Sequence, residues 1–91
     1  MVETYQIFLI DAVQDENGDY ETAYSHLMGT ILIDAFWIDD DELYEELLSM
    51  GITCLPDTFR IEGEGDGILF CNCGETGRPL VELHVISDMK K

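Results

Sequence analysis

The sequence predicts an α+β domain in which one antiparallel sheet of about five strands carries one main helix on a face, in the order ββαβββ. Three observations predict it. β-forming residues alternate along much of the chain, glycine-containing turns separate these stretches, and leucines recur at helical spacing in residues 40–50. At 91 residues the chain has room for one domain, spanning 1–91, and not for two.

The first strand is expected over residues 4–13. Both of its faces are apolar, with Tyr5, Ile7 and Leu9 on one and Phe8 and Ile10 on the other. Apolar residues on both faces are typical of a strand in the middle of a sheet.

A hairpin follows, because both residues of Asn17-Gly18 tolerate a positive φ angle. The second strand is expected to return from about Tyr20, although residues 20–28 also fit a short helix. Gly29 is a candidate β-bulge. Residues 30–38 again predict a strand, whose one face carries Ile31, Ile33, Ala35 and Trp37.

The clearest element is the helix that Asp39-Asp40-Asp41 opens, because acidic residues in a cap and first turn complement the helix dipole. Gly51 stands where a C-terminal cap is expected. The apolar stripe of this helix consists of Leu43, Leu47, Leu48 and Met50. Its outer face has no cation and carries Asp41, Glu42, Glu45 and Glu46.

Three further strands are expected after the helix. Phe59 and Ile61 alternate with charged residues, residues 68–73 are apolar except for Asn72, and residues 80–86 place Val81, Leu83 and Val85 on one face. Residues 63–67 and 74–79 are expected to be the connections between these strands.

The charge is the strongest functional hint. There are 20 Asp and Glu against 4 Lys and Arg, a formal net charge of -16, yet 46% of residues are hydrophobic. This composition excludes a disordered acidic tail, and it argues against proteins that grip phosphates or anionic membranes. Solubility usually needs a net charge of only about 2–8 in a small domain. Salt adaptation and a positively charged partner are the two remaining explanations.

The cysteines and the N-terminal residues indicate the cellular compartment in which the protein is expected. Cys54, Cys71 and Cys73 are an odd number, and Cys71 and Cys73 are too close for an unstrained bridge. There is no basic segment before the first apolar run and no stretch of the ~20 apolar residues that a membrane span needs. We expect a soluble protein of the cytoplasm.

Two loops resemble ligand sites and fail the comparison. The loop starting at Asp15 has Tyr20 and His26 where an EF-hand needs Gly and Glu, so we expect a plain hairpin turn. The spacing of Gly63, Gly65 and Gly67 is not that of a dinucleotide loop, and the acidic residues between them would repel phosphate.

The three cysteines with His26 or His84 could supply four zinc ligands, but their spacing is not that of paired C-x-x-C hooks. Small buried cysteines are the simpler interpretation. A histidine near a cysteine, such as His84, could also suggest a nucleophile and its base, but no further motif supports this. We therefore expect no enzymatic activity, no cofactor and no metal, and keep a small zinc-binding domain as an alternative.

The acidic residues themselves form the candidate partner-binding site. Carboxylates at i and i+4 on a helix lie about 5–6 Å apart, and alternate strand residues lie roughly 6.5 Å apart, which resembles the spacing of backbone phosphates. Asp41 with Glu45 and Glu42 with Glu46 would form such rows, as would Glu62 with Glu64 and Asp66. The full set is Asp39, Asp40, Asp41, Glu42, Glu45, Glu46, Asp15, Glu16, Asp19, Glu62, Glu64 and Asp66.

In its size, its charge and acidic runs such as Asp39-Asp40-Asp41-Glu42 and Glu45-Glu46, the chain resembles phage-encoded DNA-mimic inhibitors, a group that includes many anti-CRISPR and anti-restriction proteins. The group shares no motif, so the resemblance assigns no residue a role. It implies an inhibitor in the host cytoplasm that binds a basic nucleic-acid-binding protein, such as a CRISPR or restriction effector, and occupies its DNA or RNA site without chemistry.

On this hypothesis the partner is a protein, with no direct contact to nucleic acid or membrane, and a homodimer is compatible with it. Binding should weaken with salt. Reversing the charge of Glu42, Glu45 and Glu46 should abolish binding and leave the fold intact. The alternative is an interaction module or small subunit that uses an apolar patch around Phe36 and Trp37 and tolerates salt.

Overall fold

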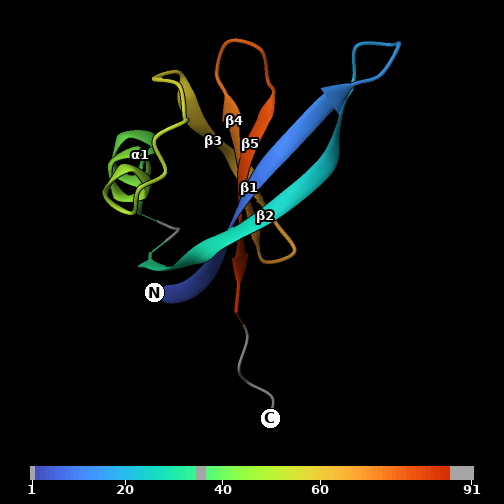
Figure 1. Cartoon of the computed structure of the whole chain (residues 1–91). Coiled ribbons are helices and arrows are strands. Elements are labelled where there is room, and N and C mark those ends of the chain that lie inside the picture. The colour runs from blue at the N-terminus through green and yellow to red at the C-terminus, as the bar shows by residue number, and fades with distance from the viewer. Residues whose placement is uncertain (1, 35–36, 87–91) are drawn as a thin grey trace.

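Five antiparallel strands form one sheet, and helix α1 packs on one of its faces (Figure 1). The computed structural model describes residues 2–34 and 37–86. Across the sheet the order is β2-β1-β5-β4-β3, so β1 is a central strand as expected. The elements are β1 Glu3–Gln14, β2 Tyr20–Ile33, α1 Asp40–Ser49, β3 Phe59–Gly65, β4 Ile68–Cys73 and β5 Pro79–Val85. The predicted fold class and the order ββαβββ are confirmed.

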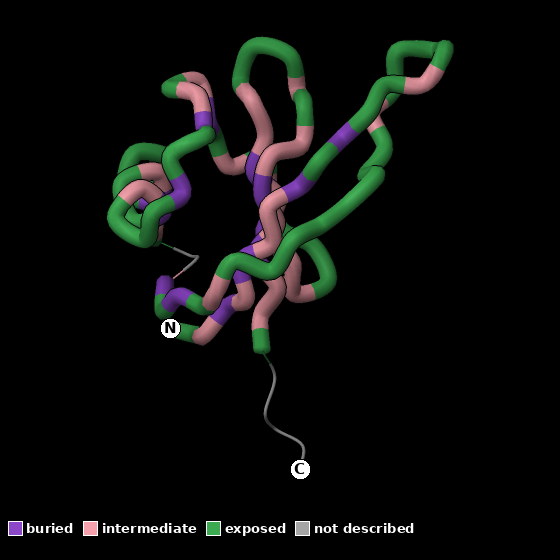
Figure 2. Tube along the Cα trace, viewed as in Figure 1, coloured by how far each residue is buried: buried purple, intermediate pink, exposed green. Residues whose placement is uncertain are grey.

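The core lies between α1 and the sheet face that it covers. Tyr5 and Ile7 of β1 are buried there, next to Leu83 of β5. Leu43 and Leu47 of α1 complete it from the other side. Figure 2 shows that β2 and the outer end of the β1–β2 hairpin are exposed along most of their length.

The β1–β2 hairpin has a three-residue loop. Gly18 adopts a φ of 86°, and its N–H donates to the Asp15 carbonyl over 3.0 Å. The Asp15 side chain also accepts hydrogen bonds from the N–H groups of Asn17 and Asp19. The predicted hairpin is therefore confirmed, but only Gly18 uses a positive φ, as in a type I turn followed by a bulge.

β2 is continuous, so residues 20–28 form a strand and not a helix. Pairing with β1 satisfies the backbone N–H and C=O groups of these residues. The weak helical pattern in their sequence does not offset the stability of this pairing. The predicted bulge is confirmed, because Ile7 pairs with Gly29 whereas Phe8 pairs with Leu27, leaving Met28 as the extra residue. A second bulge leaves Ala23 unpaired.

The strand predicted over residues 30–38 is wrong beyond Ile33. The N–H groups of Trp37 and Ile38 donate to the Asp34 carbonyl, which forms a turn before the helix, and Trp37 is 74% exposed. The expected common face of Ile31, Ile33 and Trp37 therefore ends at Ile33, while Ala35 lies outside the described residues.

α1 begins and ends as its sequence predicts. Asp39 and Glu42 form a capping box, in which each side chain accepts a hydrogen bond from the other residue's N–H. At the other end Gly51 has a φ of 93°, and the Ile52 N–H donates to the Leu47 carbonyl in a Schellman arrangement. The apolar stripe is narrower than predicted, because Leu48 is half-buried and Met50 is the C-cap and 41% exposed.

The last three strands match the prediction, with one difference in the connection over residues 63–67. β3 continues to Gly65, and only Asp66 and Gly67 form the turn, both with positive φ. The backbone of Gly67 lies against β5, where its carbonyl accepts a hydrogen bond from the Val85 N–H over 2.8 Å.

Replacing Gly67 with alanine should lower the free energy of unfolding by at least about 2 kcal/mol. An alanine at a left-handed φ costs about 1–2 kcal/mol, and its Cβ would lie 2.8 Å from Val85 Cγ1. Gly18→Ala is the matched control, because that φ is also positive but no atom lies within 4 Å. Equal losses in urea unfolding would show that the contact with Val85 costs nothing.

Candidate partner-binding surface

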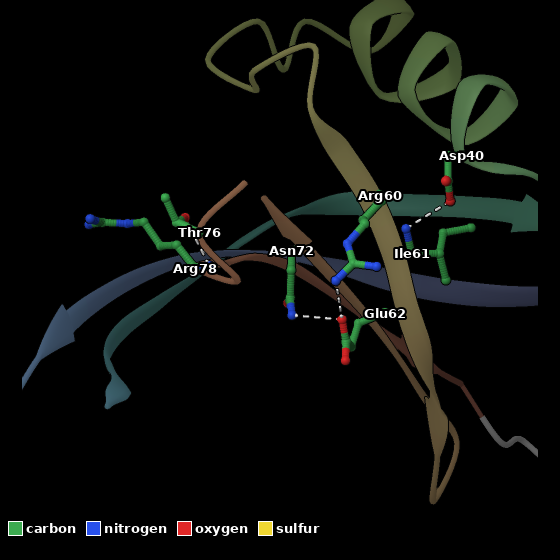
Figure 3. A network of polar contacts seen from close by, with 7 residues as sticks. All are labelled: Asp40, Arg60, Ile61, Glu62, Asn72, Thr76 and Arg78. Carbon is green, nitrogen blue, oxygen red and sulfur yellow. Dashed lines mark hydrogen bonds and ion pairs between the residues drawn. The ribbon is translucent and has the colours of Figure 1, made fainter. Parts of the chain in front are cut away.

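Six acidic residues lie on α1 and its N-cap, and all of them are exposed. Asp39 and Glu42 hold the first turn through the capping box. Asp40 reaches sideways to the sheet, where its Oδ1 accepts a hydrogen bond from the Ile61 N–H over 2.8 Å (Figure 3). These three carboxylates therefore stabilise the fold in addition to carrying charge.

The Glu42 side chain accepts a hydrogen bond from the Asp39 N–H over 3.4 Å, so reversing its charge would remove one contact of the capping box. Losing a capping side chain typically costs about 1 kcal/mol. By contrast, the side-chain carboxylates of Asp41, Glu45 and Glu46 have no hydrogen-bond or ion-pair partner among the residues that the structure describes. Their charges are available to a partner.

A second acidic group surrounds Tyr5, close to the start of α1. Burial raises the pKa of the Tyr5 phenol, and the charges of Glu3, Glu64 and Asp34 raise it further. Sequence reasoning included Glu64 but missed Glu3 and Asp34. The hairpin provides a signal for these two, because folding the chain back at Gly18 places Glu3 beside Ile33, the residue before Asp34.

Nothing on the helix side neutralises these charges in residues 2–34 and 37–86, where the only Arg or Lys residues are Arg60 and Arg78. Arg60 alternates with Phe59 and Ile61, which pack against the core, so it faces away from α1. Its Nη2 lies 3.2 Å from Glu62 Oε1 (Figure 3). Arg78 donates to the Ala12 carbonyl over 2.7 Å, on the β1–β2 hairpin.

The predicted row of Glu62, Glu64 and Asp66 is wrong as a row. A bulge at Glu62 shifts the register of β3, because Ile61 pairs with Cys71 whereas Gly63 pairs with Phe70. Glu62 consequently joins Arg60 and Asn72 on the face away from α1, whereas Glu64 pairs with the buried Leu69 and belongs to the helix side. A bulge in a strand with two glycines is not visible in the acidic spacing itself.

Asp15, Glu16 and Asp19 form a separate group at the tip of the β1–β2 hairpin. Figure 1 shows this tip at the opposite side of the molecule from α1. The Asp15 carboxylate is already engaged within the loop, because it accepts hydrogen bonds from the N–H groups of Asn17 and Asp19. The predicted site residues thus fall into two distant groups, and the group around α1 is the larger.

A hollow of about 220 Å³ lies between α1 and the end of β2. Leu32, which is 68% exposed, and Trp37 contribute apolar surface, and Glu42 and Glu46 contribute carboxylates one helical turn apart. Ile33, Ile38 and Asp34 complete the lining. This combination suits a cationic side chain with an aliphatic stem, because arginine and lysine bury their stems while the head group stays polar. The second named aromatic, Phe36, lies outside the described residues.

No protein family, curated protein or solved structure matches this chain. The structure shows no helix, within the ranges described, with the length and hydrophobicity that crossing a membrane requires.

The three cysteines have different environments. Cys71 is buried in the core, and this burial raises the pKa of its thiol to about 12. Cys73 is half-buried beside Thr58, and hydrogen bonds from Thr58, from the Thr76 side chain and from the Thr76 and Glu75 backbone lower its pKa to about 7. Cys54 is exposed.

The histidines are not placed with these thiols as a zinc site or a catalytic pair would need. His84 Nε2 lies 2.9 Å from Glu82 Oε1, and His26 Nε2 lies 2.9 Å from Asp11 Oδ2. Across the described chain, no group of three or more His, Cys, Asp and Glu side chains has an arrangement that could hold a metal ion.

Proposed function

We propose that this chain inhibits a basic nucleic-acid-binding protein by occupying its DNA or RNA site, with α1 as the contact. One observation carries the proposal. The carboxylates of Asp41, Glu45 and Glu46 have no partner in the described chain, and the side chains of both described arginines are engaged elsewhere, Arg60 with Glu62 on the opposite face of the sheet and Arg78 with the Ala12 carbonyl. Such a surface attracts a basic groove at long range and accelerates association.

The hollow beside Trp37 supports the same proposal at short range. A lysine or arginine of the partner would place its stem on Leu32 and Trp37 and its charge near Glu42 and Glu46. Binding in this way needs no cofactor and no chemistry. A CRISPR or restriction effector in the cytoplasm of a phage-infected cell is the partner class that we propose.

Charge reversal on α1 tests the proposal. The immobilised chain is incubated with a nuclease-treated bacterial lysate, and bound proteins are eluted either with rising NaCl or with double-stranded DNA. We expect DNA to release the same proteins as salt. Glu45→Lys with Glu46→Lys should weaken retention at least about tenfold, which corresponds to about 1.4 kcal/mol.

The matched control is Glu21→Lys with Glu75→Lys, which makes the same change in net charge on exposed residues outside α1. Equal loss with both pairs would mean that net charge, and not α1, determines binding. Retention that DNA cannot release would contradict nucleic-acid mimicry.

The exposure of Trp37 favours a second candidate function, a protein-interaction module that binds through apolar contacts. The same experiment separates the two. A module of this kind would keep its partner in high salt and lose it with Trp37→Ala, whereas charge reversal on α1 would change little.

A further inference from the structure

The outer edge of β2 is open. β2 is the last strand on its side of the sheet, and within the described chain it pairs with β1 alone. The outward N–H and C=O groups of an edge strand are a template for pairing with another strand. Pairing over the 12 residues 22–33 of β2 would give a contact about 40 Å long.

The opposite edge of the sheet is closed at the start of β3, which distinguishes it from the β2 edge. On β3 the Phe59 N–H donates to the Pro56 carbonyl over 3.1 Å, and the Ile61 N–H donates to Asp40 Oδ1 over 2.8 Å. Two alternate donors of that edge are therefore already used, and α1 lies against it.

The open edge also lacks the charged residues that usually protect one. Residues 22–33 contain no Asp, Glu, Lys or Arg, although 26% of the chain is charged. Leu27 is 57% exposed, and Tyr24 and Leu32 are exposed as well. Along β2 the nearest carboxylates are Glu21 before this stretch and Asp34 after it, and on the inner side Asp11 of β1 lies 2.9 Å from His26 Nε2.

We propose that two copies of this chain pair through β2, antiparallel and related by a two-fold axis, so that their sheets become one. Charge identifies the second copy as the occupant. Each copy carries a net charge of -16, so most contacts between copies place carboxylates against carboxylates. A two-fold pair of β2 strands places residues 22–33 of one copy opposite the same uncharged residues of the other, as an isologous contact requires.

The bulges at Ala23 and Met28 shape this edge without closing it. They increase the local twist and leave residues 24–27 and 29–33 as regular segments that can pair. Leu27 lies between the two bulges, close to the centre of the uncharged stretch. A charge introduced there would meet its symmetry mate in the dimer.

Sedimentation equilibrium of the purified chain tests the proposal, with Leu27→Glu as the variant and Val13→Glu as the matched control. Val13 is an exposed apolar residue of β1, away from the β2 edge. We expect the wild type and Val13→Glu to dimerise, and Leu27→Glu to weaken the dimer at least about tenfold. Circular dichroism establishes that each variant is folded.

Salt provides an independent readout, because at 0.1 M salt the repulsion between exposed charges more than about 10 Å apart is largely screened. The dimer should strengthen as salt rises, whereas binding to a basic partner should weaken.

A wild type that stays monomeric at about 0.5 M NaCl and about 1 mM protein would overturn the proposal, as would equal dimerisation of both variants. These measurements use the chain alone, so their failure leaves the proposed inhibition untouched. If Leu27→Glu does not fold, amide exchange of the wild type decides, since β2 amides should become more protected as protein concentration rises.

Discussion

Replacing Leu47 with alanine is expected to lower the free energy of unfolding by about 3 kcal/mol. Leu47 has 0% exposure, and it packs in the cluster that joins α1 to the sheet. A buried leucine stabilises a core because its apolar surface is removed from water and packs closely against its neighbours. Truncating a core leucine to alanine costs about 2–5 kcal/mol. A domain of this kind has a total stability of only about 5–15 kcal/mol, so one side chain accounts for a large share.

Leu48→Ala is the matched control for that experiment. It makes the same chemical change at the next residue of the same helix, but Leu48 is only half-buried and lies outside the core cluster. Urea unfolding should show the Leu47 variant losing at least about 1 kcal/mol more than the Leu48 variant. Equal losses would mean that α1 does not pack on the sheet through Leu47.

Cys73 is expected to react with iodoacetamide at neutral pH, with an apparent pKa of about 7, while Cys71 stays unreacted in the folded chain. The thiolate is the reactive form. At pH 7 about half of Cys73 is thiolate, whereas a thiol with a pKa of about 12 is thiolate in about one molecule in 10⁵. Mass spectrometry of the labelled peptides measures both rates across pH 5–10.

Thr58→Val tests the cause of this reactivity. The Thr58 hydroxyl lies 3.2 Å from Cys73 Sγ and is the largest contributor to the lowered pKa. Removing it should shift the alkylation profile of Cys73 toward the ordinary thiol pKa of 9.0. An unchanged profile would assign the effect to the Thr76 side chain and the backbone of the β4–β5 turn.

The same shifts give the stability of the chain a pH dependence. Since the pKa of Cys73 is lower in the folded chain than 9.0, its thiolate stabilises the fold above pH 9, and this contribution is lost as pH falls from 9 to about 7. The pKa of Cys71 is higher when folded, so its contribution is present below pH 9 and is lost as pH rises toward 12.

Local signals made most of the fold predictable. The start of α1 depends on Asp39 and its end on Gly51, and each of these signals lies within one turn of the helix end that it determines. The hairpin at Gly18 and the bulge at Gly29 likewise follow from the freedom of glycine at positive φ. The end of β2 was not predictable from alternation, because Trp37 continues the apolar pattern after the backbone has turned at Asp34.

The candidate site was predictable in composition and not in arrangement. Counting carboxylates identified α1 as the most acidic element, but residues that contribute only charge look the same in sequence as those that hold the fold. Asp40 accepts a hydrogen bond from the N–H of Ile61, which lies 21 residues further along the chain. A bulge in β3 places Glu62 and Glu64 on opposite faces of the sheet. Both depend on tertiary contacts, which a spacing argument does not contain.

The pairing of β1 with β5 has a consequence for how the chain is made. Residues near position 7 cannot be covered by their neighbours until residues near position 83 have left the ribosome. Until then the nascent hairpin leaves Ile7 exposed to water, where it can contact other nascent chains or chaperones. The central part of β1 therefore stays incompletely covered until β5 has been synthesised.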